Sequence, residues 1–459
     1  MRCENGVSEA VDTLQDKTKI AKGVWALLKY RFSRGTLPPH LLSFSVKIPL
    51  LDVNRQNKPL EAELKLAACR VVEDGRFING PEVGAFEKEL ADYCNTVSSS
   101  GGDADAAGKP DGGAPRPDGR SPDEPPAHVI ACASGSDALI VAFMALDLQP
   151  GDEVITTPYT FFATTACLTR LGLVPVYVDI NRDTFNLDVS QIEAKITPRT
   201  RAILPVHLFG HSVDMDAVLD IARRHNLRVV EDAAQSLGAR WHGRMVGTLG
   251  DIGIYSFYPS KNLGGFGDGG ALITRNAALA EKLRVLCAHG SRPKYHHHMV
   301  GVNSRLDTLQ AAMLRIKLRH LETYHAERSI RAAQYTAALQ PLATNSTVSP
   351  NSPGATSGGL LLSRPDPRGT HVHNQYCIRH PRRDALREAL TARTIGSEIY
   401  YPIPLHLQPC FAFLGHRPGD FPVSEEAART SLALPIFGEL TEAEVAYVCA
   451  AIAEFVQPE

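Results

Sequence analysis

The sequence predicts an α/β protein with a mostly parallel central sheet flanked by helices, followed by a smaller α+β domain at the C-terminus. Two observations support this fold class. Short apolar runs rich in β-branched residues alternate with segments of helical periodicity, and the runs are apolar throughout, as strands buried on both faces are. The chain has 459 residues, enough for two or three domains of about 100–200 residues each. The runs that we expect to form strands are 128–134, 153–157, 174–180, 202–208 and 228–233.

Helical patterns connect these runs, since apolar residues recur there every three or four positions. The segments with this periodicity are 137–148, 162–172 and 214–226. Two further strands, 251–258 and 270–274, follow each other without an intervening helix and are predicted to form a hairpin. A long helical pattern then begins near Arg305. Shorter elements after it predict the smaller C-terminal domain.

We divide the chain into an N-terminal extension, 1–45, a large domain, 46–305, and a long helix with a small domain, 306–459. The extension is expected to be poorly ordered or helical, with a membrane-surface role as an alternative. Segment 98–126 consists almost wholly of Gly, Pro, Ser, Ala and charged residues. It lacks the apolar surface that would offset its ordering entropy, so we expect a disordered insertion there. Segment 343–369 has a similar composition.

The composition excludes several classes of function. Lysine and arginine total 48 against 50 acidic residues, so the chain lacks the basic footprint of a nucleic-acid-binding protein. No apolar run approaches the length of a membrane-spanning helix. The nine cysteines show no ligand spacing, and the histidine run 296–298 has no second cluster of ligands, so no metal is expected. These features indicate a soluble, cytoplasmic enzyme.

Two polar motifs follow predicted strands, at the edge where an open α/β sheet binds its ligand. Gly135 and Ser136 lie between a strand and a helix. Gly135 admits a close ligand, Ser136 can cap the helix, and the free N–H groups attract an anion, although a plain helix cap also explains the motif. Asp232 ends the run 228–233, where a buried carboxylate needs a cationic partner such as a protonated heterocyclic nitrogen. The alternative is a cap or surface group.

A third motif places Lys261 between a strand and a loop with five glycines. So many glycines suggest unusual backbone angles and a group packed against the main chain. A lysine whose pKa is lowered by burial forms Schiff bases, whereas an ordinary loop lysine is a surface cation. A fourth motif, with Asn303 and Arg305, precedes the long helix. Asn303 can be a simple helix cap, and Arg305 can be a surface cation or a residue that binds a carboxylate. A phosphate cradle, a carboxylate for a ring nitrogen and a Schiff-base lysine are together what pyridoxal phosphate (PLP) requires.

From about Val46 to the C-terminus, outside 98–126 and the weak stretch near 343–369, the sequence resembles the DegT/DnrJ/EryC1/StrS family of PLP-dependent sugar aminotransferases. The resemblance implies fold type I and rests on many motifs in one order. These are FINGPEVGAFEKELADYC, SGSDAL, GDEVITTPYTFFAT, PVHLFGHSVDMD, VEDAAQSLGA, SFYPSKNLGGFGDGGA, GVNSRLDTLQAA and YYPIPLHLQPCF. The chain departs from the family pattern at Ser136, where threonine is frequent, and at His211.

The resemblance implies a role for each motif. Lys261 matches the lysine of the internal aldimine, which then moves the proton between substrate and cofactor carbons. Asp232 matches the partner of the pyridinium nitrogen. Gln235 matches the neighbour of the ring oxygen, and Phe161 the aromatic residue stacked on the ring.

Other matches concern phosphate and substrate. The phosphate cradle corresponds to Gly135, Ser136 and Ser256, with Asn303 reaching the phosphate from the partner subunit. This match implies a homodimer with shared active sites. The residues implied in donor or sugar-nucleotide binding are Arg305, Tyr401 and His406.

The family transfers an amino group from glutamate, or glutamine in one branch, to a keto-sugar linked to a nucleoside diphosphate. The form of the motif around Lys261 favours a 3-keto over a 4-keto sugar. One alternative is a PLP-dependent deoxysugar dehydratase, although in such relatives histidine replaces the lysine. Another is a non-catalytic regulatory relative, whose binding to DNA the near-neutral charge disfavours.

Overall fold

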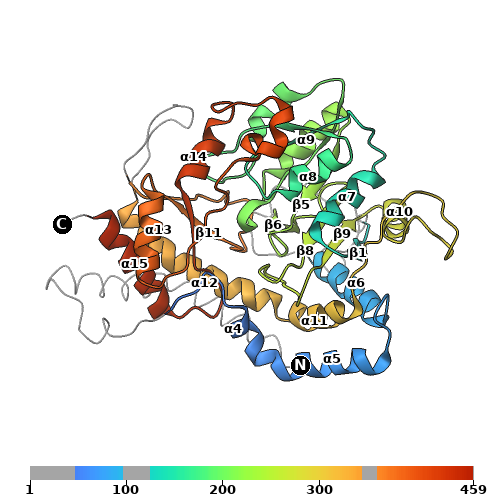
Figure 1. The fold of residues 1–459 in the computed structure, drawn as a ribbon, viewed down its shortest axis with the longest axis horizontal. Helices are drawn as coiled ribbons and strands as arrows, with labels where there is room; N and C mark the ends of the chain where they lie inside the picture. The colour runs from blue at the N-terminus through green and yellow to red at the C-terminus, as the bar shows by residue number, and fades with distance from the viewer. Residues whose placement is uncertain (1–46, 97–124, 344–358, 458–459) are drawn as a thin grey trace, which may run out of the picture.

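The computed structural model describes residues 47–96, 125–343 and 359–457 (Figure 1). The expected N-terminal extension, 1–45, and nearly all of the expected insertion, 98–126, lie outside the described residues. Within the described residues, no helix combines the length and the apolar character that crossing a membrane requires.

A sheet of seven strands forms the centre of the molecule, in the order β1-β9-β8-β5-β4-β2-β3. Only β9 runs against its neighbours, pairing antiparallel with β1 and β8; the pairs from β8 to β3 are parallel. The mostly parallel sheet and the β8–β9 hairpin predicted from the sequence are therefore confirmed. The strands are β1 (His128–Cys132), β2 (Glu153–Thr156), β3 (Val174–Tyr177), β4 (Thr200–Ile203), β5 (Arg228–Asp232), β8 (Ile252–Ser256) and β9 (Gly270–Thr274).

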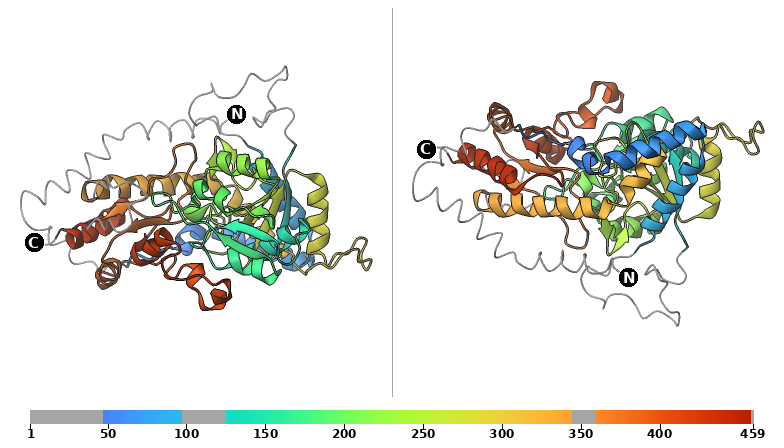
Figure 2. Two further views of the ribbon diagram at one scale, coloured as in Figure 1. Left: turned by 90° about the horizontal axis from the view of Figure 1, so that it is seen from above. Right: turned by 90° about the horizontal axis from the view of Figure 1, so that it is seen from below.

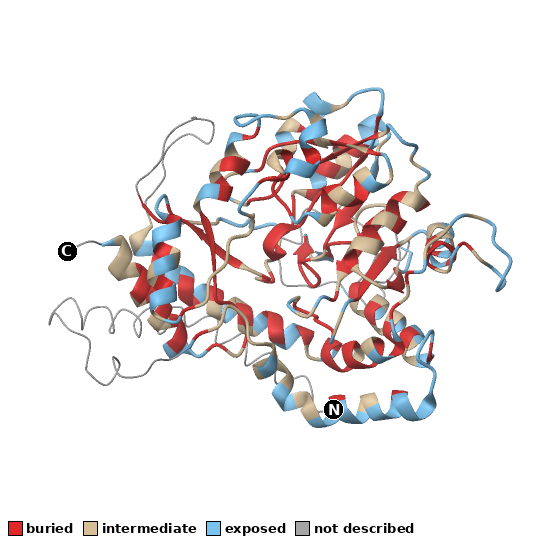
Figure 3. Ribbon diagram, in the orientation of Figure 1, coloured by how far each residue is buried: buried red, intermediate tan, exposed pale blue. Residues whose placement is uncertain are grey.

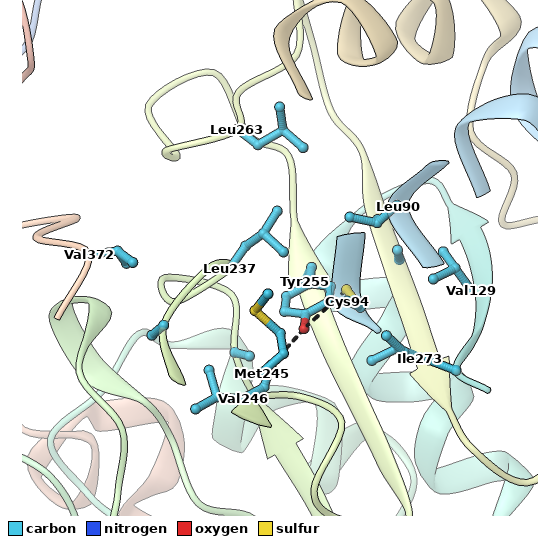
Figure 4. Close-up of a cluster of buried hydrophobic side chains, with 14 of the residues drawn as sticks. Leu90, Cys94, Val129, Leu237, Met245, Val246, Tyr255, Leu263, Ile273 and Val372 are labelled. Carbon is cyan, nitrogen blue, oxygen red and sulfur yellow. Dashed lines mark hydrogen bonds between the residues drawn. The ribbon is translucent and has the colours of Figure 1, made fainter. Parts of the chain in front are cut away.

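Helices cover both faces of this sheet because successive strand residues point to opposite sides. Val230 and Ile254 pack with one set of helices, whereas Val229 and Tyr255 pack with the other. The first set is α7 (Gly135–Ala145), α8 (Ala163–Arg170) and α10 (Ala277–Cys287). The second set is α6 (Pro81–Cys94), α9 (Met215–His225) and α11 (Thr308–Leu318). Figure 4 shows part of this second core, where the Tyr255 hydroxyl donates a hydrogen bond of 2.6 Å to the carbonyl of Val246.

The C-terminal part forms a smaller α+β unit around an antiparallel sheet with the order β10-β11-β12. Helix α12 (Leu321–Leu339) leads into it and packs against α15, as both views of Figure 2 show. Its other elements are β10 (Leu361–Leu362), β11 (Tyr376–Arg379), α13 (Arg383–Ala392), α14 (Pro422–Thr430), β12 (Ser431–Leu434) and α15 (Glu442–Val456).

The first described residues pack against this small unit, although the sequence analysis places them in the large domain. Ile48 is fully buried in its core, and Arg55 of α4 (Val53–Asn57) forms two hydrogen bonds with Glu444, of 2.8 and 2.9 Å. Helix α5 (Glu61–Asp74) then lies along α11 and is mostly exposed (Figure 3), with only Leu64 and Val71 buried.

Two local expectations need correction. The helical pattern expected to begin near Arg305 forms two helices, α11 from Thr308 and α12 from Leu321. The stretch 343–369 does not behave as a disordered insertion over its described part. Within it, β10 joins the small sheet, and Arg368 forms an ion pair of 2.7 Å with Asp214 of the large domain.

Candidate active site

Three of the predicted site residues, Gly135, Asp232 and Ser256, lie at or just beyond the carboxyl ends of strands at one edge of the sheet. Strand β5 ends at Asp232 and β8 ends at Ser256, while the turn at Gly135 comes three residues after the end of β1. Parallel strands bring their carboxyl ends to one edge, which is where open α/β sheets bind ligands. The topology thus brings together motifs that lie up to 121 residues apart in the sequence, the separation of Gly135 from Ser256.

Asp232 is held in a nearly water-free position at this edge. Its residue is 5% exposed, and its carboxylate accepts hydrogen bonds from the Thr164 hydroxyl, at 2.9 Å, and from the Ala234 N–H, at 3.2 Å. Burial raises the pKa of the Asp232 carboxyl group, while the bond from Thr164 opposes this rise. An ionised carboxylate in such a position calls for a cationic neighbour.

Lys261 is half-buried, and its titratable amine lies near enough to Asp232 to respond to its charge. Burial lowers the pKa of Lys261 from its ordinary value of 10.5 to about 8, and attraction to the Asp232 carboxylate acts in the opposite direction. The two groups therefore lie near enough to influence each other's charge. An amine with a lowered pKa is a better nucleophile at neutral pH because more of it is unprotonated.

Gln235 connects this pair of groups to the small domain. Its side-chain oxygen accepts a hydrogen bond of 2.7 Å from the Phe209 N–H, and its side-chain nitrogen donates one of 3.0 Å to the Tyr401 hydroxyl. Phe161, which is 55% exposed, lies beside the same tyrosine with 6.2 Å between the ring centroids. The structure thus places Gln235, Phe161 and Tyr401 side by side.

The turn after β1 packs directly against the end of β8. A Cβ atom at Gly135 would lie 2.9 Å from the Cβ of Ser256, so this close approach requires glycine. The capping role expected for Ser136 is wrong: Ser134 is the N-cap of α7, and its hydroxyl accepts the Asp137 N–H at 3.0 Å. Ser136 instead lies in the first turn of α7, beside the N–H groups that an anion would contact.

The glycine loop after Lys261 differs from expectation in its backbone. None of its five glycines has a positive φ, so the left-handed backbone that their number suggested is absent from this loop. Close packing accounts for them instead, since a Cβ at Gly264 would lie 2.3 Å from the carbonyl oxygen of Pro259. Likewise, a Cβ at Gly270 would lie 2.4 Å from the carbonyl carbon of Ser134.

A cavity of about 560 Å³ adjoins the turn after β1 and brings Asn303 and Arg305 to this region. Asn303 is exposed and Arg305 is half-buried. The lining also includes acidic and amide side chains. The residues around the cavity are Ile78, Ala133, Ser134, Gly267, Asp268, Asn303, Arg305, Asp307 and Gln310.

His406 is not part of this arrangement. Its side chain is fully buried, lies 3.1 Å from a carboxylate oxygen of Glu425 and packs against Phe421, with 4.8 Å between the ring centroids. Contact of His406 with the substrate stays a prediction, and in this structure its neighbours are Glu425 and Phe421. His211, the other noted departure, is also buried, and its backbone carbonyl accepts a hydrogen bond from Asn186.

Sequence reasoning missed two groups that support Asp232. Thr164 lies one turn after Phe161, at the start of α8, and its hydroxyl reaches the carboxylate. Glu231 points to the other face of the sheet, where it pairs with His207 at 3.0 Å and accepts three backbone N–H groups. The backbone N–H of His207 donates a hydrogen bond of 3.0 Å to the backbone carbonyl oxygen of Asp232. For Glu231, the sequence signal that could have indicated a role was its position next to Asp232, as one of two adjacent acids at the end of a strand.

Comparison with known proteins identifies related sequences over most of the chain. The profile of the DegT/DnrJ/EryC1/StrS aminotransferase family matches residues 126–453. A protein named "Pleiotropic regulatory protein" from Geobacillus stearothermophilus is 42% identical over 411 residues, which cover 89% of this chain and 99% of that protein. A dTDP-3-amino-3,4,6-trideoxy-alpha-D-glucose transaminase from Streptomyces venezuelae is 40% identical and covers 90% of this chain and 97% of its own length.

The same similarity extends to solved structures. The crystal structure of DesV from S. venezuelae, in complex with a ketimine intermediate, matches this fold with a TM-score of 0.78 and 39% sequence identity. The match covers 90% of this chain and 99% of DesV.

Proposed function

Since the chain belongs to the DegT/DnrJ/EryC1/StrS aminotransferase family, we propose that it transfers an amino group from an amino acid to a keto-sugar linked to a nucleoside diphosphate. The donor is glutamate or glutamine, and the acceptor carbon is C3 rather than C4. The observation that carries this proposal is the buried Asp232 carboxylate at the sheet edge, with the half-buried amine of Lys261 near enough to respond to its charge. The 3-amino product in the name of the S. venezuelae relative supports the choice of carbon. That the enzyme is cytoplasmic stays a prediction.

The residues of the site fit PLP as the cofactor. When bound, PLP supplies an aldehyde that bonds to amines and a protonated ring that withdraws electrons. The buried Asp232 carboxylate provides the anionic partner that a protonated ring nitrogen needs. The lowered pKa of Lys261 gives the unprotonated amine that covalent attachment requires. The same amine, when unprotonated, would act as the base that moves a proton at the substrate carbon.

Two further residues orient the ring. We assign Gln235 to the ring oxygen and Phe161 to one face of the ring. The hydrogen bonds from Phe209 and to Tyr401 fix the amide of Gln235, and the large exposure of Phe161 leaves its ring free for stacking. We assign Tyr401 itself to the sugar-nucleotide, because its hydroxyl reaches the site from the small domain.

The phosphate is assigned to Gly135, Ser136 and Ser256. The first turn of α7 offers backbone N–H groups there, and the missing side chain of Gly135 allows Ser256 to approach. We assign Arg305 to the donor carboxylate or to the nucleotide, since it lines the adjoining cavity.

We also propose that the enzyme is a homodimer in which Asn303 reaches the phosphate of the partner subunit. Asn303 is exposed at the cavity, and large apolar side chains on and near the same rim are exposed, as at protein interfaces. These side chains are Phe77, Ile78, Tyr258, Phe266 and Leu309. We expect Asn303→Ala to weaken PLP binding without changing the dimer mass in light scattering. A monomeric wild-type protein would contradict the shared site.

The proposed chemistry is tested by colour and by products. The purified protein with PLP should show visible absorbance that Lys261→Ala abolishes and the surface control Lys282→Ala retains. Incubation with glutamate or glutamine and a panel of nucleotide-linked 3-keto and 4-keto sugars should then yield aminated products in mass spectrometry. A colourless wild-type protein would overturn the cofactor, and deoxygenated rather than aminated sugar would indicate a dehydratase.

The name of the Geobacillus relative makes a regulatory role the second candidate. A regulator that binds DNA would show salt-sensitive retention of DNA in a filter-binding titration. We expect no such retention, because the 48 basic residues are balanced by 50 acidic ones.

A further inference from the structure

Two side chains of α11 reach the loop that follows Lys261. Lys317 is fully buried, and its ammonium donates a hydrogen bond of 2.6 Å to the carbonyl oxygen of Gly264. About two helical turns earlier, the side-chain oxygen of Gln310 accepts a hydrogen bond of 2.8 Å from the Phe266 N–H. The two bonds engage backbone groups that are three and five residues beyond Lys261.

Burying an ammonium group costs folding free energy unless the group forms hydrogen bonds or ion pairs that compensate for the lost hydration. Burial lowers the pKa of Lys317 to about 8, and the group that its ammonium contacts is a backbone carbonyl rather than a carboxylate. The ring centroid of Phe266, in the same loop, lies 5.8 Å from the Lys317 nitrogen. The hydrogen bond and the ring contact of this costly cation are both with the glycine loop, while the Glu439 carboxylate also attracts its charge.

The glycines of the loop allow these contacts. A Cβ at Gly265 would lie 2.9 Å from the Gln310 side-chain oxygen, and one at Gly267 would lie 2.9 Å from its side-chain nitrogen. Leu263, which Figure 4 shows near Leu237, is 1% exposed and anchors the same loop in the core. The loop is therefore fixed from α11 on one side and from the core on the other.

We propose that Lys317 and Gln310 are positioning residues, which hold the loop at Gly264 and Phe266 and so keep the amine of Lys261 directed toward Asp232. Neither residue needs to touch the cofactor or the substrate. The inference rests on the proposed role of Lys261 as the residue that bonds to PLP, but the contacts between α11 and the loop exist independently of that role.

The first test measures backbone hydrogen exchange in the full-length protein with PLP added. Gln310→Leu removes the acceptor of the Phe266 N–H, whereas Gln310→Glu keeps an acceptor oxygen of similar size. We expect exchange in peptides covering 262–267 to become about tenfold faster or more in the leucine variant, as the loss of one hydrogen bond predicts. The glutamate variant should exchange at close to the wild-type rate.

The second test uses Lys317→Met, with Arg319→Met as the control that removes an exposed cation from the end of the same helix. Lys317→Met should speed exchange in the loop and weaken the visible circular dichroism of bound PLP, while Arg319→Met should change neither. Unchanged loop exchange in both Lys317→Met and Gln310→Leu would overturn the inference. Should Lys317→Met fail to fold, the two Gln310 variants decide the matter. A wild-type protein that binds no PLP would instead refute the proposed function, while the exchange data would still show whether α11 holds the loop.

Discussion

The amine of Lys261 should titrate near pH 8, far below an ordinary lysine side chain. Burial lowers its pKa from 10.5 to about 8, and this difference corresponds to about 3.4 kcal/mol of preference for the neutral form. At pH 7 about 9% of the amine would then be unprotonated, roughly 300 times the fraction in an exposed lysine. The structure therefore predicts an amine ready to bond to an aldehyde near neutral pH.

The variant Asp232→Asn tests the electrostatic part of this reasoning. The Asp232 carboxylate raises the pKa of Lys261, so its removal leaves the effect of burial unopposed. Because a nearby opposite charge favours the charged form of a titratable group, we expect the titration midpoint of Lys261 to fall, by up to about one pH unit. The control is Asp147→Asn, which removes an exposed carboxylate that pairs with Lys282.

Reductive methylation with ¹³C-formaldehyde, followed by NMR titration of the cofactor-free protein, measures this midpoint directly. Burial also lowers the pKa of Lys317 to about 8, so the variant Lys261→Arg is needed to identify the resonance of Lys261. A Lys261 resonance that titrates near 10.5 would refute the burial argument. A midpoint that moves equally in Asp232→Asn and Asp147→Asn would refute the coupling to Asp232.

Three further predictions concern stability and cofactor binding. Glu231→Leu should lower the free energy of unfolding, measured in urea, by about 3–5 kcal/mol. The reason is that the backbone N–H groups of Gly247, Leu249 and Gly250 lose their acceptor. A loss below about 1 kcal/mol would contradict this prediction. Burial lowers the pKa of His325 to about 3, so below pH 6.5 the unfolded state binds a proton that the folded state does not. The free energy of unfolding should therefore fall by up to about 1.4 kcal/mol for each pH unit below 6.5. The variant His325→Asn should reduce this slope. Gly135→Ala should weaken PLP binding about tenfold in an absorbance titration, since its Cβ would crowd the cradle, whereas Gly84→Ala, which has open space around its Cβ, should not.

The sequence predicted the sheet because each of its strands is a continuous apolar run, and such a run can be recognised from a short segment of sequence alone. It also predicted that Lys261 and Asp232 share one edge, since both motifs directly follow strands whose carboxyl ends must meet. The sequence predicted Ser136 as the cap of α7, whereas the structure has Ser134 in this role, because α7 begins at Gly135. A shift of one or two residues in that start exchanges their roles.

Contacts between distant elements could not be read from local patterns. Nothing in the sequence around Thr164 shows that its hydroxyl meets a carboxylate 68 residues later. From the sequence alone, Lys317 is expected to be an exposed lysine on an amphipathic helix. In the fold it is completely buried against the glycine loop. His406 sits in a motif that pointed to substrate, and that motif does not show that its neighbours are Glu425 and Phe421.

The electrostatics of the site depend on these unpredicted contacts as much as on the motifs. Burial alone would drive Asp232 toward its neutral form and Lys261 toward its neutral form, and each would then lose the charge that attracts the other. The hydrogen bonds from Thr164 and Ala234 oppose this for the acid by favouring its ionised state. A charged Asp232 in turn limits how far the pKa of Lys261 falls. Burial of the amine is therefore what lowers its pKa to about 8, and the acid, kept charged with the help of Thr164 at the start of α8, limits the fall.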